Sequence, residues 1–329
     1  MRPFAYLSAD TPKGAIAAST ADSQFLAGGT TLLDLMKLDV MQPQRIIDIN
    51  PLAAKYGRIE RSAEGLSLGA LVRMAEAADD PNLNRDYPVL AQALHLAASP
   101  QLRNMATLGG NVLQRTRCPY FRDPSYEACN KRAPGSGCAA IGGLNRKHAV
   151  LGASEYCIAT YAGDFAQALI ALDASVELAG PDGQRRIAFE QLHRLPGSSP
   201  QLETTLAPGE LITAFSVPSG PWTRRSLYLK IRDRESFAFA LASAAVALDL
   251  DGDEVKDARI GLGGVATVPW RAREAEAMLK GKPMTEAGAE AAAEAAFDKA
   301  RTRDQNAYKP ELGRRTLVRA LLGAAALEI

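Results

Sequence analysis

Phe25-Leu26-Ala27-Gly28-Gly29-Thr30-Thr31-Leu32-Leu33 is the stretch of sequence that decides the fold. Phe25-Leu26-Ala27 predicts a short apolar strand that ends at the glycines, and Thr30 or Thr31 can cap a helix that continues through Met36. Glycine lets backbone amides approach a phosphate without an intervening Cβ, and a helix N-terminus adds partial positive charge. The stretch therefore predicts either a turn that binds a phosphate-bearing cofactor or an ordinary structural turn.

A second glycine turn, Thr107-Leu108-Gly109-Gly110-Asn111, follows later in the chain. Asn111 can both donate and accept hydrogen bonds toward a cofactor. Two turns of this kind in one domain could clamp both ends of a dinucleotide. Gly261-Leu262-Gly263-Gly264 matches the G-x-G-x-x-G dinucleotide fingerprint poorly, and we interpret it as structural packing.

Four cysteines, Cys118, Cys129, Cys138 and Cys157, are the only ones in the chain, and all lie within one short stretch. Their spacing is not the paired C-x2-C spacing of zinc fingers or bacterial ferredoxins. Four thiolates are nevertheless the ligand set of a 4Fe–4S or 2Fe–2S cluster, and of zinc. The alternative is four unrelated buried cysteines that act as small apolar residues.

The composition around the cysteines favours a ligand-held loop. Residues 115–150 are interrupted by prolines, glycines and charges, and a structureless loop of this length is uncommon unless it is functional or held by a ligand. Basic side chains there could offset the charge of a thiolate-bound cluster or could form a solvated loop: Arg115, Arg117, Lys131 and Arg132. His148 is a fifth candidate ligand, but we favour a side chain that contacts a ligand or is structural, and His95 and His193 are interpreted as structural.

The whole chain sets broader limits. Its 329 residues suggest two or three domains, and its net charge of +1 gives no general argument for a nucleic-acid partner. Residues 1–6 lack the apolar segment of a signal peptide, and no apolar run is long enough for a membrane helix. We therefore expect a cytoplasmic protein with reduced thiols, unless it is exported together with a signal-bearing partner subunit.

Periodicity predicts the order of the elements. Residues 4–50 read as strand, helix, strand, loop, helix, strand, and a helix over 87–98 is broken at Ser99-Pro100. The best domain boundary is Ser219-Gly220-Pro221. Beyond it, a strand over 239–250 runs into Asp251-Gly252, a strong hairpin signal. Two terminal helices, over 285–301 and 310–327, complete an α+β domain.

The two glycine stretches, extended to Asn104-Met105-Ala106-Thr107-Leu108-Gly109-Gly110-Asn111, resemble the two FAD-binding signatures of the medium subunit of molybdenum hydroxylases, the xanthine dehydrogenase family. The resemblance covers essentially the whole chain. Because most members lack an insertion with cysteines over 115–158, the chain looks most like the FAD and 4Fe–4S subunit of the periplasmic aldehyde oxidoreductase. The stretches Gln114–Arg122 and Cys129–Arg132 favour that branch.

The resemblance implies a set of site residues. The FAD contacts that it carries over are Ala27, Gly28, Gly29, Thr30, Thr31, Leu32, Thr107, Gly109, Gly110, Asn111, Asp164, Ile212 and Lys230. The metal ligands that it implies are Cys118, Cys129, Cys138 and Cys157, which would hold a 4Fe–4S cluster. No residue of this chain is expected to act as an acid or base on the organic substrate.

The resemblance also implies a fold and partners. We expect an α+β protein with the FAD-binding fold of the vanillyl-alcohol-oxidase/molybdenum-hydroxylase type over residues 1–220, in subdomains of about 1–55 and 56–220, and a smaller α+β C-terminal domain of the CO dehydrogenase flavoprotein type over 221–329. The partners would be a large molybdopterin-binding subunit and a small 2Fe–2S subunit in a heterotrimer, with no nucleic acid and no membrane insertion.

The function implied is electron transfer through FAD and the 4Fe–4S cluster to an external acceptor, within an enzyme that oxidises an aldehyde to a carboxylic acid. Two alternatives stay open from the sequence. One is the FAD subunit of an enzyme like 4-hydroxybenzoyl-CoA reductase or xanthine dehydrogenase. The other is a zinc-stabilised binding module in which the glycine turns are merely structural.

Overall fold

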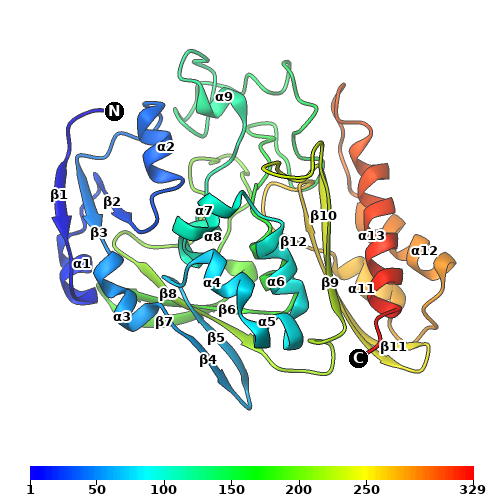
Figure 1. Cartoon of the computed structure of the whole chain (residues 1–329). Helices are drawn as coiled ribbons and strands as arrows, with labels where there is room; N and C mark the ends of the chain where they lie inside the picture. Colours follow the sequence, from blue (N-terminus) through cyan, green and yellow to red (C-terminus); the bar gives the residue numbers. More distant parts are fainter.

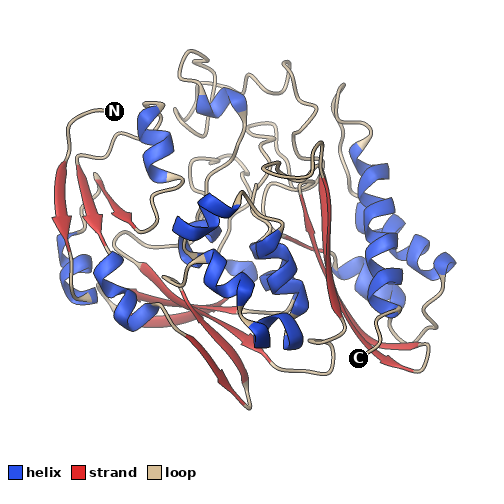
Figure 2. Cartoon of the chain, in the orientation of Figure 1, coloured by secondary structure: helices blue, strands red, loops and turns tan.

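Three β-sheets organise the chain, which the computed structural model describes from Met1 to Ile329 (Figure 1). Helices cover the sheets, and the residues between 113 and 160 form a loop-rich region at one end of the molecule (Figure 2). We call residues 115–158 the cysteine segment. Its only helix is α9, Pro119–Arg122, and that helix lies at the same end of the molecule as α2 (Figure 1).

The first sheet is parallel and three-stranded, in the order β1-β3-β2. Its strands are β1 Ala5–Ser8, β2 Ser23–Leu26 and β3 Arg45–Asp48, and its helices are α1 Pro12–Ala18 and α2 Leu32–Lys37. This confirms the predicted order of elements over residues 4–50. The expected threonine cap of α2 is wrong, because Thr31 has a helical backbone conformation and its side chain makes no capping hydrogen bond.

The second sheet is antiparallel and five-stranded, in the order β4-β5-β8-β6-β7. Its strands are β4 Ile59–Ser62, β5 Gly65–Gly69, β6 Ser175–Gly180, β7 Gly183–Ala188 and β8 Leu211–Pro218. The largest apolar core includes residues of this sheet and of the helices α4 (Met74–Asp79), α6 (Pro88–His95) and α10 (Phe165–Ala171). Tyr228 and Ala245 of the third sheet belong to the same core, so the second and third sheets share one apolar interior.

Besides α9, the other helices between β3 and β6 are also short; α3 precedes β4, and the rest follow β5. They are α3 Ala53–Tyr56, α4 Met74–Asp79, α5 Pro81–Asp86, α6 Pro88–His95, α7 Pro100–Met105, α8 Leu108–Val112 and α10 Phe165–Ala171. The predicted break at Ser99-Pro100 is confirmed, but the proline also begins the next helix. Ser99 caps α7 by accepting from the amide of Leu102, and a proline suits the first helical turn because no carbonyl partner exists there for its missing N–H.

The third sheet is antiparallel, in the order β12-β11-β10-β9. Its strands are β9 Ser226–Ile231, β10 Ala242–Asp251, β11 Glu254–Gly263 and β12 Trp270–Arg271, and its helices are α11 Arg273–Leu279, α12 Glu286–Phe297 and α13 Lys309–Ala325. The hairpin at Gly252 is confirmed. The strand predicted from Phe239 begins only at Ala242, because Phe239 is half exposed and lies over the guanidinium of Arg117 instead.

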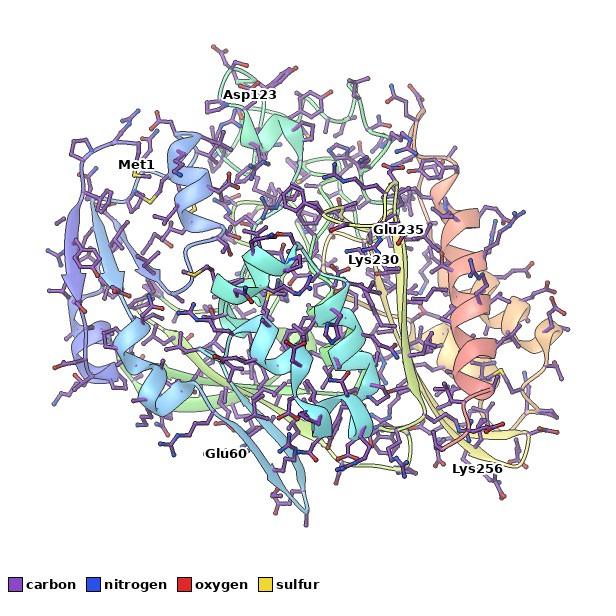
Figure 3. All side chains as sticks on the ribbon, in the orientation of Figure 1. Met1, Glu60, Asp123, Lys230, Glu235 and Lys256 are labelled. Carbon is purple, nitrogen blue, oxygen red and sulfur yellow. The ribbon has the colours of Figure 1, made fainter.

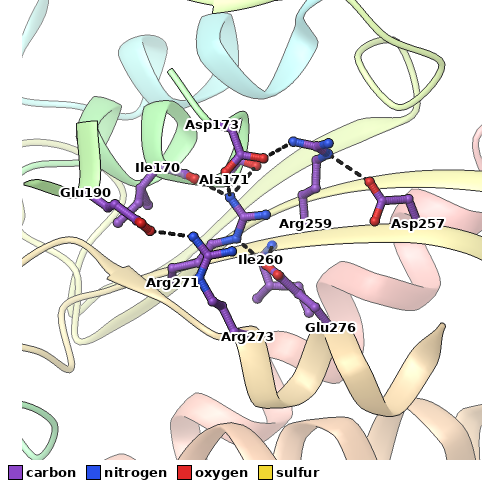
Figure 4. A network of polar contacts seen from close by, with 10 residues as sticks. All are labelled: Ile170, Ala171, Asp173, Glu190, Asp257, Arg259, Ile260, Arg271, Arg273 and Glu276. Atoms are coloured by element: carbon purple, nitrogen blue, oxygen red, sulfur yellow. Dashed lines mark hydrogen bonds and ion pairs between the residues drawn. The ribbon is translucent and has the colours of Figure 1, made fainter. Parts of the chain in front are cut away.

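A polar network joins helix α10 and the residues just after it to the third sheet (Figure 4). The buried guanidinium of Arg271, on β12, donates to the carbonyls of Ile170 and Ala171 at the C-terminal end of α10, and pairs with Asp173 at 2.6 Å. Glu276 of α11 pairs with Arg271 and accepts from the amide of Ile260 at 2.7 Å. The network fixes the last turn of α10 against the edge of the third sheet.

None of the helices is at once long and apolar enough to cross a lipid bilayer.

Candidate functional site

The first glycine turn presents a row of free backbone N–H groups. It follows β2 and precedes α2, and none of the amides of residues 27–32 has a carbonyl partner. Gly29 has φ +71°, a left-handed conformation that glycine adopts without steric cost. Consecutive amides that point out of a turn into the start of a helix form an anion-binding concavity. The turn therefore fits a pyrophosphate, as the sequence predicted for Ala27–Leu32.

The two glycine turns lie against each other. A Cβ on Gly28 would stand 2.0 Å from the carbonyl oxygen of Met105, which directly precedes the second turn. Only a residue without a side chain fits there, since real Cβ atoms do not approach an oxygen so closely. The structure therefore brings together two stretches that are about eighty positions apart in the sequence.

The second turn differs from the first, because most of its backbone N–H groups already have hydrogen-bond acceptors within the protein. Leu108 and Gly109 donate to the carbonyls of Val72 and Ala70, at 3.0 and 2.8 Å. Thr107 caps α8 by accepting from the amide of Gly110 at 3.2 Å. The group left over is the side-chain oxygen of Asn111, which is buried and has no partner. This orphaned acceptor fits a bound polar ligand, because buried polar groups are normally paired.

Two residues that the sequence did not single out tie the turns together. Asn50, just after β3, donates to the carbonyl of Ala27 at 2.9 Å. Its side-chain oxygen accepts from Arg73 at 3.0 Å, and Arg73 also donates to the carbonyl of Met105. A polar residue directly after a strand was the only sequence signal for Asn50. Arg73 gave none, because its partners come from distant parts of the chain.

Asp164 and Lys230 form a buried ion pair. The Lys230 ammonium lies 2.8 Å from one Asp164 oxygen and donates to the carbonyl of Leu96 at 2.9 Å. The Tyr228 hydroxyl donates to the other Asp164 oxygen at 2.6 Å. Burial raises the pKa of the Asp164 carboxyl, and Lys230 and Tyr228 oppose that rise. Lys230, which Figure 3 labels, is buried, so the interpretation of Lys230 as a solvated strand lysine is wrong.

Ile212 lies on β8, opposite Leu178 of β6, and is buried. It belongs to the same apolar core as Ala106 and Leu108 of the second turn. The structure thus places Ile212, Asp164 and Lys230 in or beside the core that supports the turns. That these residues and the turns contact FAD stays a prediction.

The four cysteines converge although their spacing is irregular. All four line one small pocket, and Cys129 and Cys138 are opposed in an isolated antiparallel bridge. They form no disulfide. The free space between them, about 10 Å³, holds about one water molecule. The cysteine segment is therefore folded around its own thiols.

The chemistry of this pocket fits a thiolate-bound cluster. Burial raises the pKa of the Cys118 thiol to about 12, so a bound cation is what would hold it as a thiolate. The amide of Ala159 points at the Cys157 sulfur at 3.5 Å, the kind of donor that stabilises sulfur charge. No three His, Cys, Asp or Glu side chains are placed to hold a single metal ion. A 4Fe–4S cluster does not require three ligands around one metal ion, because each of its four thiolates binds a different iron.

The basic residues of the cysteine segment form ion pairs and hydrogen bonds within the protein. Arg117 and Arg122 both pair with Asp34 of α2, at 3.1 and 2.8 Å. Lys131 pairs with Glu203 at 2.9 Å, and Arg115 pairs with the same carboxylate. Arg132 donates to the carbonyls of Tyr120 and Phe121, at 2.7 and 2.9 Å. The reading of a solvated basic loop is therefore wrong.

The three histidines differ in their surroundings. His148 is buried beside the thiol pocket, and burial lowers its pKa to about 4. His193 is half-buried, its Nε2 lies 3.2 Å from the carbonyl oxygen of Val112, and its ring packs edge-on against Tyr161. His95 is at the end of α6, with its side chain partly exposed. Of the three, only His148 approaches a predicted site residue through its ring.

A cavity of about 340 Å³ separates the second turn from the thiol pocket. Its lining begins at Val112 and Leu113, directly after Asn111, and reaches Cys157. Lys131, Cys157 and Ala159 line both this cavity and the thiol pocket. The cavity therefore extends from the residues directly after the second turn to the edge of the thiol pocket.

Comparison with known proteins assigns a family to this arrangement. Residues 2–220 match the family described as the FAD binding domain in molybdopterin dehydrogenase, and residues 227–329 match the CO dehydrogenase flavoprotein C-terminal domain. The chain is 46% identical to the aldehyde oxidoreductase FAD-binding subunit PaoB of Escherichia coli (strain K12), over 99% of both chains. It is 27% identical to the carbon monoxide dehydrogenase medium chain of Hydrogenophaga pseudoflava, over 84% of this chain and 79% of that one.

Solved structures agree with these sequence matches. A carbon monoxide dehydrogenase chain from Hydrogenophaga pseudoflava superimposes with a TM-score of 0.75 at 27% identity, over 99% of this chain and 98% of that chain. Quinoline 2-oxidoreductase from Pseudomonas putida 86 shares the fold, with a TM-score of 0.75 at 23% identity, over 98% of this chain and 97% of that chain. The expected fold is confirmed, and these relatives are oxidoreductase subunits.

The alternative of a zinc-stabilised binding module is not supported, because residues 2–220 match an FAD-binding domain. The chain belongs to the FAD-binding medium subunits of the molybdenum hydroxylase family, and it is the flavin subunit of an oxidoreductase.

Proposed function

We propose that this chain is the electron-transfer subunit of a molybdenum-dependent aldehyde oxidoreductase, and that it holds a 4Fe–4S cluster as well as FAD. The observation that carries the proposal is the convergence of all four cysteines on one pocket. Cys118 follows Asn111 by only seven positions, so the cluster ligands begin directly after the second glycine turn. The 46% identity to an aldehyde oxidoreductase subunit supports an aldehyde as the substrate of the whole enzyme.

In this proposal the chain's own residues bind and orient FAD. The free amides of residues 27–32 bind the pyrophosphate, and Asn111 offers its orphaned oxygen as an acceptor. Lys230, held by Asp164, supplies a fixed positive charge beside the flavin. When bound, FAD supplies a ring that accepts two electrons and releases them singly or as a pair.

The cysteine segment holds the cluster and keeps it close to the flavin. The four cysteines act as ligands, and the nearby ammonium of Lys131 lowers the cost of negative charge at Cys157. The cavity between the thiol pocket and the second turn shares three lining residues with that pocket. Electrons that arrive from the molybdenum and 2Fe–2S subunits then have a short path between the two groups, before they leave to an external acceptor.

We infer a heterotrimer with a large molybdopterin-binding subunit and a small 2Fe–2S subunit. The relatives at similar length are named as medium chains or FAD-binding subunits, which supports this composition. We also propose that the chain is periplasmic if a signal-bearing partner exports the folded complex, and cytoplasmic otherwise. Fractionation of cells that express all three subunits tests the compartment.

Analysis of iron, acid-labile sulfide and flavin in the purified protein tests the proposed cofactors. We expect one FAD and four iron and four sulfide per chain, the content of one 4Fe–4S cluster. Bound zinc without iron would contradict the proposal. Turnover by the assembled enzyme then tests the substrate. Oxidation of xanthine, or reduction of an aromatic CoA thioester, in place of aldehyde oxidation would favour the xanthine dehydrogenase-like or 4-hydroxybenzoyl-CoA reductase-like alternative.

A further inference from the structure

His148 lies directly behind one of the four thiols. Its Nε2 is 3.2 Å from the sulfur of Cys118, and the residue is only 3% exposed. The distance suits a hydrogen bond to sulfur, which accepts over longer distances than oxygen. Cys118 faces the pocket that it shares with Cys129, Cys138 and Cys157. His148 does not line that pocket, so the imidazole contacts a predicted ligand from outside it.

The surroundings of the ring decide which nitrogen carries the proton. Nδ1 of His148 is buried and has no hydrogen-bond partner. A proton on Nδ1 would leave a buried donor unpaired, which is costly, whereas a proton on Nε2 can be donated to a sulfur that carries negative charge. The tautomer with Nε2–H is therefore favoured whenever Cys118 is a thiolate.

The C-terminal domain fixes the position of His148. The buried ammonium of Lys309, at the start of α13, donates to the carbonyls of His148 and Lys147, each at 3.1 Å, and to that of Gly264 at 2.6 Å. Asn306 donates to the carbonyls of His148 and Ala149, each at 3.4 Å. Both side chains hold the main chain at His148, so the backbone position from which the ring reaches Cys118 is fixed by buried hydrogen bonds.

We propose that His148 is a positioning residue that donates its Nε2–H to the Cys118 sulfur and thereby raises the reduction potential of the cluster, an inference that rests on the 4Fe–4S cluster proposed above. One added electron increases the negative charge on the cluster and on its ligand sulfurs. A hydrogen-bond donor stabilises that extra charge more than it stabilises the oxidised form. The histidine therefore favours uptake of an electron by the cluster.

The test compares variants in the complete enzyme by potentiometric titration, with the reduced cluster followed by electron paramagnetic resonance. His148→Leu removes the donor, and we expect a shift of the cluster's midpoint to lower potential with iron and sulfide content unchanged. His148→Gln retains an N–H near the position of Nε2, and we expect it to recover most of the shift. His95→Leu removes the partly exposed histidine at the end of α6, which lines neither the cavity nor the thiol pocket, and should leave the midpoint unchanged.

Two results would overturn the inference while leaving the proposed cluster intact. One is an unaltered midpoint in His148→Leu. The other is loss of iron from His148→Leu that His148→Gln does not restore, because that result would make His148 a ligand. If the leucine variant does not assemble, His148→Asn, whose amide is too short to reach the sulfur, replaces it. Absence of iron and sulfide from the unaltered protein would instead overturn the proposed cluster and this inference together.

Discussion

Gly28 is where the two glycine turns leave no room for a side chain, since an added Cβ would stand 2.0 Å from the Met105 carbonyl oxygen. We predict that Gly28→Ala separates the turns, lowers the unfolding free energy by about 1–3 kcal/mol or more, and reduces the flavin content. The measurement is the ratio of flavin to protein after purification, together with urea unfolding. Gly142→Ala is the matched control, because a Cβ there meets nothing within 4 Å. Full flavin occupancy in Gly28→Ala would contradict the prediction.

The buried pair of Asp164 and Lys230 gives a prediction with a pH dependence. Lys230→Met leaves the Asp164 carboxylate buried without its counter-ion, and removal of one partner of a buried pair costs about 3–5 kcal/mol. Burial already raises the pKa of Asp164, and loss of the lysine removes an opposing effect. The folded variant therefore prefers the protonated carboxyl, so its stability falls as pH rises above 3.8, the ordinary pKa of aspartate.

Urea unfolding of Lys230→Met from pH 5 to pH 8 checks this sign. The stability deficit relative to the unaltered protein should grow with pH. The double variant Lys230→Met/Asp164→Leu should lose that dependence, because no buried carboxyl remains to titrate. A deficit of equal size at all these pH values would show that Lys230 acts through packing alone.

The role of an individual residue could be predicted from the sequence where it depends on the type of that residue and its immediate neighbours. The glycine turns and the four cysteines are visible in the sequence because residue type alone restricts what they can do. Asn50 and Arg73 could not be predicted, since they link Ala27 to Met105 through contacts that exist only in the folded chain. The threonine cap failed for a related reason, because the turn at 27–32 leaves its donors free.

At the scale of elements, regular segments followed the sequence and the cysteine segment did not. The hairpin at Gly252 was predictable because its strands are long, apolar and joined by a strong turn signal. The path of the chain over 115–158 was not, because it is set by thiol packing and by ion pairs such as Arg122 with Asp34. The segment contains one short helix, so its sequence has no sustained hydrophobic period from which its structure could be predicted.

Among the contacts between elements, we expect the hydrogen bonds from Arg271 of β12 to the end of α10 to contribute most to stability. Arg271→Met leaves the carbonyls of Ile170 and Ala171 without their donor and Glu276 buried without its partner. We predict a loss of about 3–5 kcal/mol in unfolding free energy. Lys299→Ala breaks an exposed pair with Glu274, which solvent screens, and should cost much less. Equal losses in the two variants would contradict a special role for the buried network.

At the scale of the whole molecule, the cysteine segment contacts both halves of the chain. Arg122 joins it to α2, which follows the first glycine turn, and Lys309 joins it to the C-terminal domain. A cluster held in this segment would thus be fixed relative to the flavin domain from two sides. The order of electron transfer depends on such fixed separations, which makes removal of one ligand informative about the entire subunit.

Cys138→Ser is the variant that separates an electron-transfer role of the cluster from a purely structural one. A serine oxygen replaces one of four thiolates, so we predict loss of iron and sulfide from the chain while FAD, bound at the glycine turns, is retained. We further expect the heterotrimer to form and aldehyde turnover to be largely lost. Chemical analysis measures iron, sulfide and flavin, size-exclusion chromatography measures assembly of the heterotrimer, and steady-state kinetics measure turnover. Normal turnover in an iron-free complex would exclude the cluster from the electron path, whereas failure of the subunits to associate would assign it a role in holding the cysteine segment.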